Sequence, residues 1–146
     1  MSHHVSAHRT GYTMVELLLV LAVVGVTAAV GVRQMRAYLD RVATRAAVVE
    51  AALAVADARD AAGTVHALTV LRVDTVVGSL TLWARGERLA THALAHQHGV
   101  RVSTTRDSIA FDVRGLGYGA ANLTLVARRG SAADTLVISR LGRTRY

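Results

Sequence analysis

Glu16 is a carboxylate at the edge of the longest apolar run in the chain, where a charge needs a partner. The run extends from Leu17 to Val32, and Thr27 is its one polar residue. A helix through residues 12–32 would rise roughly 30 Å, enough to cross the hydrocarbon core of a bilayer. A carboxylate near the membrane end of such a helix is costly when it is unpaired, so Glu16 is a candidate functional residue.

Arginine supplies all the positive charge and gathers toward the C-terminus. The chain has 17 Arg and no Lys against ten acidic residues, and its formal charge of +7 suits anionic partners. The candidate anion-binding residues are Arg128, Arg129, Arg140, Arg143 and Arg145. In an extended tail Arg143 and Arg145 share one side and can contact successive phosphates, while Tyr146 can stack on a base. The alternatives are a solvated basic edge that discourages strand aggregation, or a contact with an acidic neighbouring protein.

Three histidines, His92, His96 and His98, form a cluster with metal-ligand chemistry. His92 and His96 stand one helical turn apart if the segment is helical, and a metal would need further ligands such as His66 or Asp107. The chain has no Cys, so it offers neither disulfides nor thiolate ligands. We favour a polar surface loop here and expect no metal and no other cofactor.

No arrangement typical of an enzyme is present. The serines at positions 103, 108 and 139 stand in no catalytic motif, and the carboxylates are scattered. The glycines at positions 115, 117 and 119 lack the strand-to-helix context and the Lys of a phosphate-binding loop. We therefore expect a structural or binding protein rather than an enzyme, with Trp83 and Phe111 in its core.

One helix over residues 12–62 is expected to position Glu16 and to lead into a folded domain, with Gly63 as a natural end. Its second half has apolar residues at alternating spacings of four and three, typical of an amphipathic helix. The members of this stripe are Met35, Leu39, Val42, Ala46, Val49, Leu53 and Ala56. The stripe is predicted to lie on a sheet.

After Gly63 the pattern changes to segments rich in Val, Leu and Thr, which are typical of strands. Strands are expected at residues 64–73, 80–84, 100–104, 109–113, 123–128 and 135–139. Hairpins are expected to turn at residues 105–107 and 129–131, a short helical turn or loop at 87–97, and a flexible loop at 115–119. The predicted fold class is α+β, a long N-terminal helix packed on antiparallel sheet.

The segment from Gly11 to Leu17, Gly-Tyr-Thr-Met-Val-Glu-Leu, resembles the class III leader of type IV pilins and pseudopilins. The resemblance implies that a prepilin peptidase cuts after Gly11 and methylates the new amino terminus at Tyr12. It also implies that Glu16 pairs with the Tyr12 amine of a neighbouring subunit when helices pack in a filament. Two charges that are each costly in an apolar environment would then form a pair.

Later segments resemble the GspH/FimT-type minor pseudopilins. The similar segments are the Ala-rich residues 51–62, residues 108–112 followed by Gly115, and residues 137–139 followed by Gly142 and Arg143. The resemblance implies a cleaved leader at 1–11, a transmembrane and filament-core helix at 12–32, and a soluble pilin-like domain at 33–146. The tail Gly142-Arg143-Thr144-Arg145 resembles the Gly-Arg-x-Arg tail with which the FimT-like branch binds DNA, which implies nonspecific DNA as a partner.

The resemblance implies a minor pilin or pseudopilin subunit of a type II secretion or type IV pilus filament. The implied partners are the prepilin peptidase, other pilins and the membrane. The implied location is the bacterial inner membrane, with one span, the domain in the periplasm, and a pilus or pseudopilus after assembly. Arg33, Arg36, Arg41 and Arg45 follow the apolar run while Arg9 alone precedes it, so the positive-inside rule favours the opposite topology. The alternative function is a single-pass membrane-anchored adaptor that enters no filament.

Overall fold

The structure, a computed structural model, describes residues 12–119 and 122–146. It divides into two units, one ending at Arg36 and one running from Ala37 to Tyr146. Helix α1, Met14–Thr64, contributes its first part to one unit and its second part to the other. The predicted long helix is therefore confirmed, with each end two residues further along the chain than expected.

The N-terminal part of α1 is apolar enough to cross a membrane. An 18-residue window has a mean hydropathy of 2.5, and none of it is buried. Large apolar side chains such as Leu18, Leu19 and Leu21 are exposed around the helix. A helix that is hydrophobic on all sides needs an apolar environment or apolar partners.

The C-terminal part of α1 buries mainly alanines, together with Val48 and Val55, and exposes its other large apolar residues. Its buried residues include the alanine face, which we define as Ala47, Ala51, Ala54, Ala58 and Ala62. The large residues form a second face, the valine–leucine face, defined as Leu39, Val42, Val49 and Leu53. These four side chains are 36% to 57% exposed. At 100° per residue the two faces point in opposite directions. The prediction that the stripe from Met35 to Ala56 lies on the sheet is therefore wrong, because the alanine face, with Val48 and Val55, is the side that is buried.

Five antiparallel strands form sheet A, in the order β3-β2-β1-β5-β6. The strands are β1 Thr69–Asp74, β2 Ser79–Ala84, β3 Glu87–His92, β5 Ser108–Phe111 and β6 Gly117–Tyr118. Alternate residues such as Leu71, Leu82 and Phe111 are buried, so one face of sheet A belongs to the core. The residues on the other face of sheet A are exposed or half-buried.

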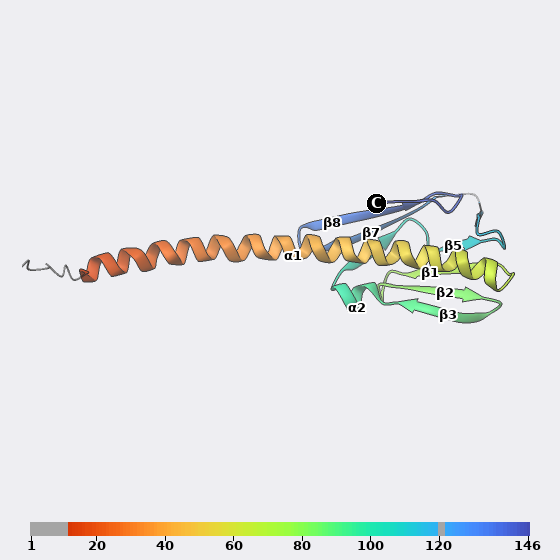
Figure 1. Cartoon of the computed structure of the whole chain (residues 1–146), viewed down its shortest axis with the longest axis horizontal. Helices are drawn as coiled ribbons and strands as arrows, with labels where there is room; N and C mark the ends of the chain where they lie inside the picture. Colours follow the sequence, from red (N-terminus) through yellow and green to blue (C-terminus); the bar gives the residue numbers. More distant parts are fainter. Residues whose placement is uncertain (1–11, 120–121) are drawn as a thin grey trace, which may run out of the picture. The chain divides into compact units, whose positions relative to one another are not determined.

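Four further strands form sheet B, in the order β4-β7-β8-β9. They are β4 Arg101–Thr104, β7 Leu123–Arg129, β8 Ala132–Ile138 and β9 Thr144–Arg145, and the short helix α2, Leu94–His98, precedes β4. One hydrophobic cluster joins Ala51 of α1, Phe111 of sheet A and Leu136 of sheet B. Figure 1 shows the yellow part of α1 running alongside both sheets. The predicted α+β fold, a long helix on antiparallel sheet, is confirmed.

Residues 87–97 contain a strand, where the sequence was expected to form a helical turn or loop. Arg85 and Gly86 both have positive φ, 51° and 83°, as in the two-residue turns that close tight hairpins. The chain therefore reverses directly from β2 into β3. Helix α2 begins only at Leu94, two residues after β3 ends at His92.

The predicted hairpin between residues 100–104 and 109–113 is also wrong. β4 pairs with β7 in sheet B, whereas β5 pairs with β1 in sheet A. The connection between them passes from one sheet to the other and is tied to both. The Thr105 N–H donates to the Thr124 carbonyl oxygen at 3.0 Å, and the Val73 N–H donates to the Asp107 carbonyl oxygen at 2.7 Å. The predicted hairpin through residues 129–131 is confirmed, since β7 pairs with β8 along its length.

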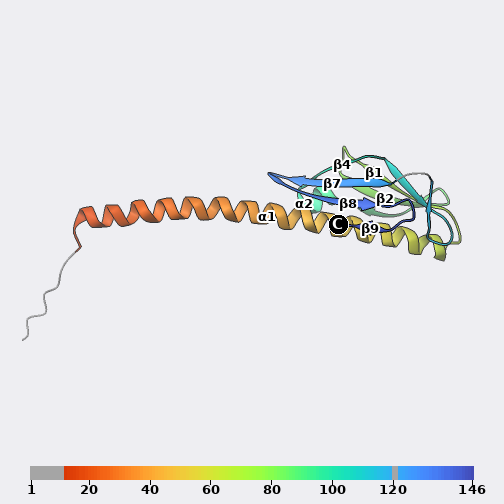
Figure 2. The same cartoon turned by 90° about the horizontal axis from the view of Figure 1, so that it is seen from above.

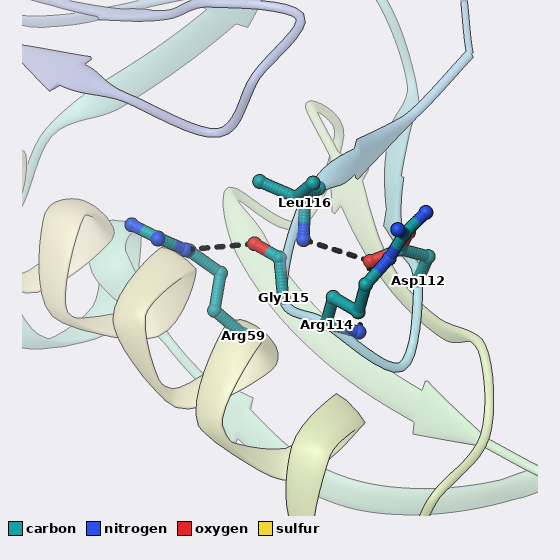
Figure 3. Close-up of polar contacts among 5 residues, drawn as sticks. All are labelled: Arg59, Asp112, Arg114, Gly115 and Leu116. Carbon is teal, nitrogen blue, oxygen red and sulfur yellow. Dashed lines mark hydrogen bonds and ion pairs between the residues drawn. The ribbon is translucent and has the colours of Figure 1, made fainter.

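The segment expected as a flexible loop begins with a hydrogen-bonded turn and continues into β6. The Asp112 Oδ1 atom accepts hydrogen bonds from the N–H groups of Arg114 and Leu116, each at 2.9 Å. The pKa of the Asp112 carboxyl is lowered, chiefly by the Leu116 N–H and further by Arg114, against an opposing effect of desolvation. From α1, the Arg59 Nε–H donates to the Gly115 carbonyl oxygen at 3.0 Å (Figure 3). The turn is thus fixed to the helix.

Candidate functional site

A hairpin between β8 and β9 holds the C-terminal arginines. The Gly142 N–H donates to the Ser139 carbonyl oxygen, and the Ser139 N–H donates to the Arg143 carbonyl oxygen, both at 2.8 Å. Gly142 has a φ of 78°, the left-handed conformation that lets a short loop close in this way. Arg143 consequently lies opposite Ser139, and Arg145 lies opposite Val137.

Arg143 and Arg145 lie on the outer face of sheet B, which points away from the core. Val137, the partner of Arg145, is exposed, whereas its neighbours Leu136 and Ile138 in β8 are buried. Because side chains alternate along strands, residues two apart share a face. The sequence-based expectation that Arg143 and Arg145 share one side in an extended tail is consistent with this register.

Arg128 of β7 joins them on the outer face and stands directly opposite Arg101 of β4. Like charges opposite each other on neighbouring strands destabilise a sheet, so this pair would gain from an anion bound between its members. Arg101 was not among the predicted residues, because only the pairing of β4 with β7 brings it next to Arg128. We call Arg101, Arg128, Arg143 and Arg145 the arginine face.

No carboxylate from the described strands of sheet B stands on this outer face. Their one acidic residue, Asp134, is on the inner side, where its Oδ2 atom lies 3.4 Å from Nη1 of Arg45. The neutral neighbours on the outer face include Ser103, Thr124 and Thr135. The arginine face is therefore a cationic surface without local neutralisation by its own sheet.

The other residues predicted for anion binding lie elsewhere. Arg129 points to the helix side, where its Nε atom lies 3.1 Å from Asp40 Oδ1 and its Nη1 donates to the His98 carbonyl oxygen at 2.8 Å. Arg140 is exposed in the loop between β8 and β9. The Tyr146 ring lies under Arg45, with 4.7 Å from the guanidinium carbon to the ring centroid, and its stacking on a base stays a prediction. Figure 2 shows the C-terminus beside α1.

The histidines meet a carboxylate of α1 rather than one another. The Glu50 carboxylate lies 2.6 Å from His98 Nε2 and 3.6 Å from His92 Nδ1. His92 ends β3 and His96 is exposed on α2, so the expected one-turn spacing on a single helix is wrong. Within residues 12–119 and 122–146, no group of three or more acidic or His side chains has the geometry of a metal site. This polar cluster instead attaches β3 and α2 to the helix.

The N-terminal candidates lie at the start of α1. Tyr12 is exposed just before the helix, and Gly11 lies outside the described residues. The Glu16 N–H donates to Thr13 Oγ1 at 3.2 Å, and Thr13 with Glu16 three residues later matches the capping-box pattern at a helix start. Glu16 therefore has a possible function in helix capping in addition to charge pairing.

Trp83 and Phe111, both predicted to be core residues, differ in position. Phe111 is fully buried, as predicted. Trp83 lies on the outer face of sheet A and is only half-buried, so that prediction is wrong. In β2 the buried positions are taken by Leu80, Leu82 and Ala84, and strand alternation sends the indole to the opposite side.

The structure is similar to that of the type IV minor pilin FimU from Pseudomonas aeruginosa, solved in two crystal forms. One form has 16% identity and a TM-score of 0.60 over 74% of this chain and 90% of the FimU chain. The other has 17% identity and a TM-score of 0.55 over 69% and 90%. No protein-family model and no curated protein matches the sequence. The predicted pilin fold is confirmed, while the GspH/FimT subtype stays a prediction.

Proposed function

We propose that this chain is a minor pilin or pseudopilin, a subunit of a type IV pilus or type II secretion filament. In this proposal a prepilin peptidase removes residues 1–11 after Gly11 and methylates the amino group of Tyr12. Residues 12–32 cross the bacterial inner membrane once and later join the filament core. Residues 33–146 form the soluble domain, on the periplasmic side before assembly.

The observation that carries the proposal is the combination of a pilin fold with a helix that exposes most of its large apolar residues. The N-terminal part of α1 exposes Leu and Val around the helix, and the domain exposes the valine–leucine face. Val42 and Val49, with Arg41, Arg45 and Ala46, also line a shallow apolar hollow of about 430 Å³. Apolar surface of this extent is typical of an interaction site, and packing with other pilin helices would cover it.

Replacing Glu16 tests the proposal. Removing one partner from a buried ion pair costs about 3–5 kcal/mol. Glu16→Ala should therefore lower the amount of the chain in the sheared filament fraction more than about tenfold. Membrane insertion should be unchanged, and intact-mass measurement should give a mature protein that begins at a methylated Tyr12.

Glu16→Gln is the matched control, because Gln also fits the third helical position of a capping box but has no charge. We expect Glu16→Gln to fail in assembly as Glu16→Ala does. If Glu16→Gln enters filaments normally, Glu16 acts as a cap and not as a charge partner. A parent chain that is inserted in the membrane but absent from every filament would support the membrane-anchored adaptor instead.

We also propose that the arginine face binds DNA without sequence preference. The supporting observation is that Arg101 and Arg128 stand opposite each other, with Arg143 and Arg145 on the same acid-free face. A guanidinium group can donate two parallel hydrogen bonds to one phosphate. Up to four such contacts on one small domain should give weak binding, in the nonspecific range of about 10⁻⁴ to 10⁻⁶ M, so capture would depend on several copies in one filament.

Fluorescence anisotropy with labelled duplex DNA tests this second proposal, using the full chain in detergent micelles. The logarithm of the binding constant should fall with the logarithm of salt concentration with a slope of about −3 to −4, as four released counterions predict. The variants Arg101→Ala/Arg128→Ala and Arg143→Ala/Arg145→Ala should each halve that slope. The control Arg88→Ala/Arg106→Ala removes the same charge elsewhere and should keep it. An equal reduction of the slope in all three variants would mean that net charge alone, and not the arginine face, explains the binding.

A further inference from the structure

The outer face of sheet A has a different chemistry from the arginine face, and Trp83 of β2 lies on it. Trp83 stands opposite Val70 on β1, and Val70 stands opposite Ala110 on β5. On its other side Trp83 stands opposite Arg88 of β3. Trp83 is also the one tryptophan in the chain. A partly exposed Trp on the outer face of a sheet offers a ligand an aromatic surface.

A hollow of about 530 Å³ lies beside this indole, within the range of about 300–1,000 Å³ that is typical of small-molecule sites. The side chains that carry its polar chemistry are Arg72, Asp74, Thr81, Asp107 and Ser108. Arg72 stands opposite Thr81 on one neighbouring strand and Ser108 on the other. The guanidinium group and the two hydroxyls therefore come from three adjacent strands of one rigid sheet. We call this site the Trp83 hollow.

Local hydrogen bonds hold the two carboxylates in place. The Asp74 Oδ1 atom accepts from the N–H groups of Val76 and Val77, each at 2.9 Å, and Asp107 Oδ1 accepts from the Ser108 hydroxyl at 3.3 Å. Among the described residues Arg72 takes part in no ion pair. The hollow thus offers a guanidinium donor and positioned carboxylate acceptors.

This mixture of charges selects against polyanions and suits an uncharged ligand with many hydroxyl groups. Asp74 and Asp107 would repel phosphates, in contrast to the acid-free arginine face. A hydroxyl both donates and accepts, so it can use carboxylates, the guanidinium and the neighbouring hydroxyls together. The C–H side of a sugar ring is apolar and flat enough to lie on an indole. We propose that the Trp83 hollow binds a sugar ring of a neutral carbohydrate, an inference that does not rest on the proposed function.

Fluorescence titration of the full chain in detergent micelles is a direct test, because all tryptophan emission comes from the site. The probes are the methyl glycosides of glucose, galactose and N-acetylglucosamine. Saturation-transfer NMR with the same glycosides follows the fluorescence titration. At least one should give a saturable response in the millimolar range. Trp83→Ala, measured by NMR, and Arg72→Ala should each weaken binding at least about tenfold. Trp83→Phe should retain part of the glycoside binding, and Arg128→Ala/Arg143→Ala should retain all of it.

Circular dichroism should show that Trp83→Ala is folded, since the side chain is outside the core. If that variant does not fold, Arg72→Ala and Asp107→Asn, both at the surface, decide the question. The absence of a saturable response to every glycoside would overturn the proposal, as would binding that survives in both Trp83→Ala and Arg72→Ala. Quenching of Trp83 by a single-stranded oligonucleotide, without any response to sugars, would assign the site to nucleic acid instead.

Discussion

Ala54→Asp is expected to unfold the domain or to lower its free energy of unfolding by about 3 kcal/mol or more. Ala54 is fully buried on the alanine face, within the cluster that joins α1 to both sheets. An aspartate there would place a charge without a partner in the core, one of the few changes that cost so much. A domain with about 5–15 kcal/mol of stability cannot absorb such a loss without consequence.

Leu53→Asp is the matched control, one residue away and on the valine–leucine face of the helix. Leu53 is 57% exposed, so its replacement should change the free energy of unfolding by less than about 1 kcal/mol, mostly through helix propensity. Urea denaturation of the full chain in detergent micelles, followed by Trp83 fluorescence, measures both. Hydrophobicity alone predicts the reverse order, since Leu is the more apolar residue lost. An equal or larger effect of Leu53→Asp would contradict the assignment of the two faces.

The helix illustrates what the sequence could and could not predict about the fold. Periodicity identified the length of α1, but the chain carries two apolar stripes on that helix, one of alanines and one of larger residues. The alternating spacing of four and three predicts that the stripe from Met35 to Ala56 lies on the sheet. The structure shows that the alanine face takes this position, with Val48 and Val55 beside it. Local pattern carries no information on which stripe meets which partner.

The strands show the same limit, which also applies to the candidate site. The sequence predicts the positions of most strands. It also predicts a hairpin of β4 with β5, whereas β4 pairs with β7 and β5 pairs with β1. Pairing across such sequence separations depends on the tertiary fold. In the arginine face, the spacing of Arg143 and Arg145 in the sequence is enough to predict that they lie on one side. Arg101 is identified only by its position opposite Arg128, because this contact also depends on the tertiary fold. The contact of Glu50 with His92 and His98 likewise joins elements that are distant in sequence.

The valine–leucine face gives the second large prediction, that Val42→Asp/Val49→Asp abolishes entry into filaments. The two side chains are 47% and 36% exposed in the isolated chain, so the substitutions should leave the urea midpoint nearly unchanged. In a filament each new carboxylate would have to lose its water at a helix–helix contact, at a cost of several kcal/mol per charge. The amount of the chain in the sheared filament fraction should then fall to background.

The control Val76→Asp/Val77→Asp adds the same two charges on the turn between β1 and β2, where both valines are exposed. We expect that variant to assemble normally, because charge alone should not exclude a subunit. A Val42→Asp/Val49→Asp chain that enters filaments as well as the parent would show that the face stays in solvent after assembly. The exposed valines and leucines would then need another partner, and the membrane-anchored adaptor would become the better account of the helix. Loss of assembly with unchanged folding would instead mean that the two faces of α1 have different functions: the alanine face, with Val48 and Val55, packs in the domain core, and the valine–leucine face joins the subunit to its neighbours.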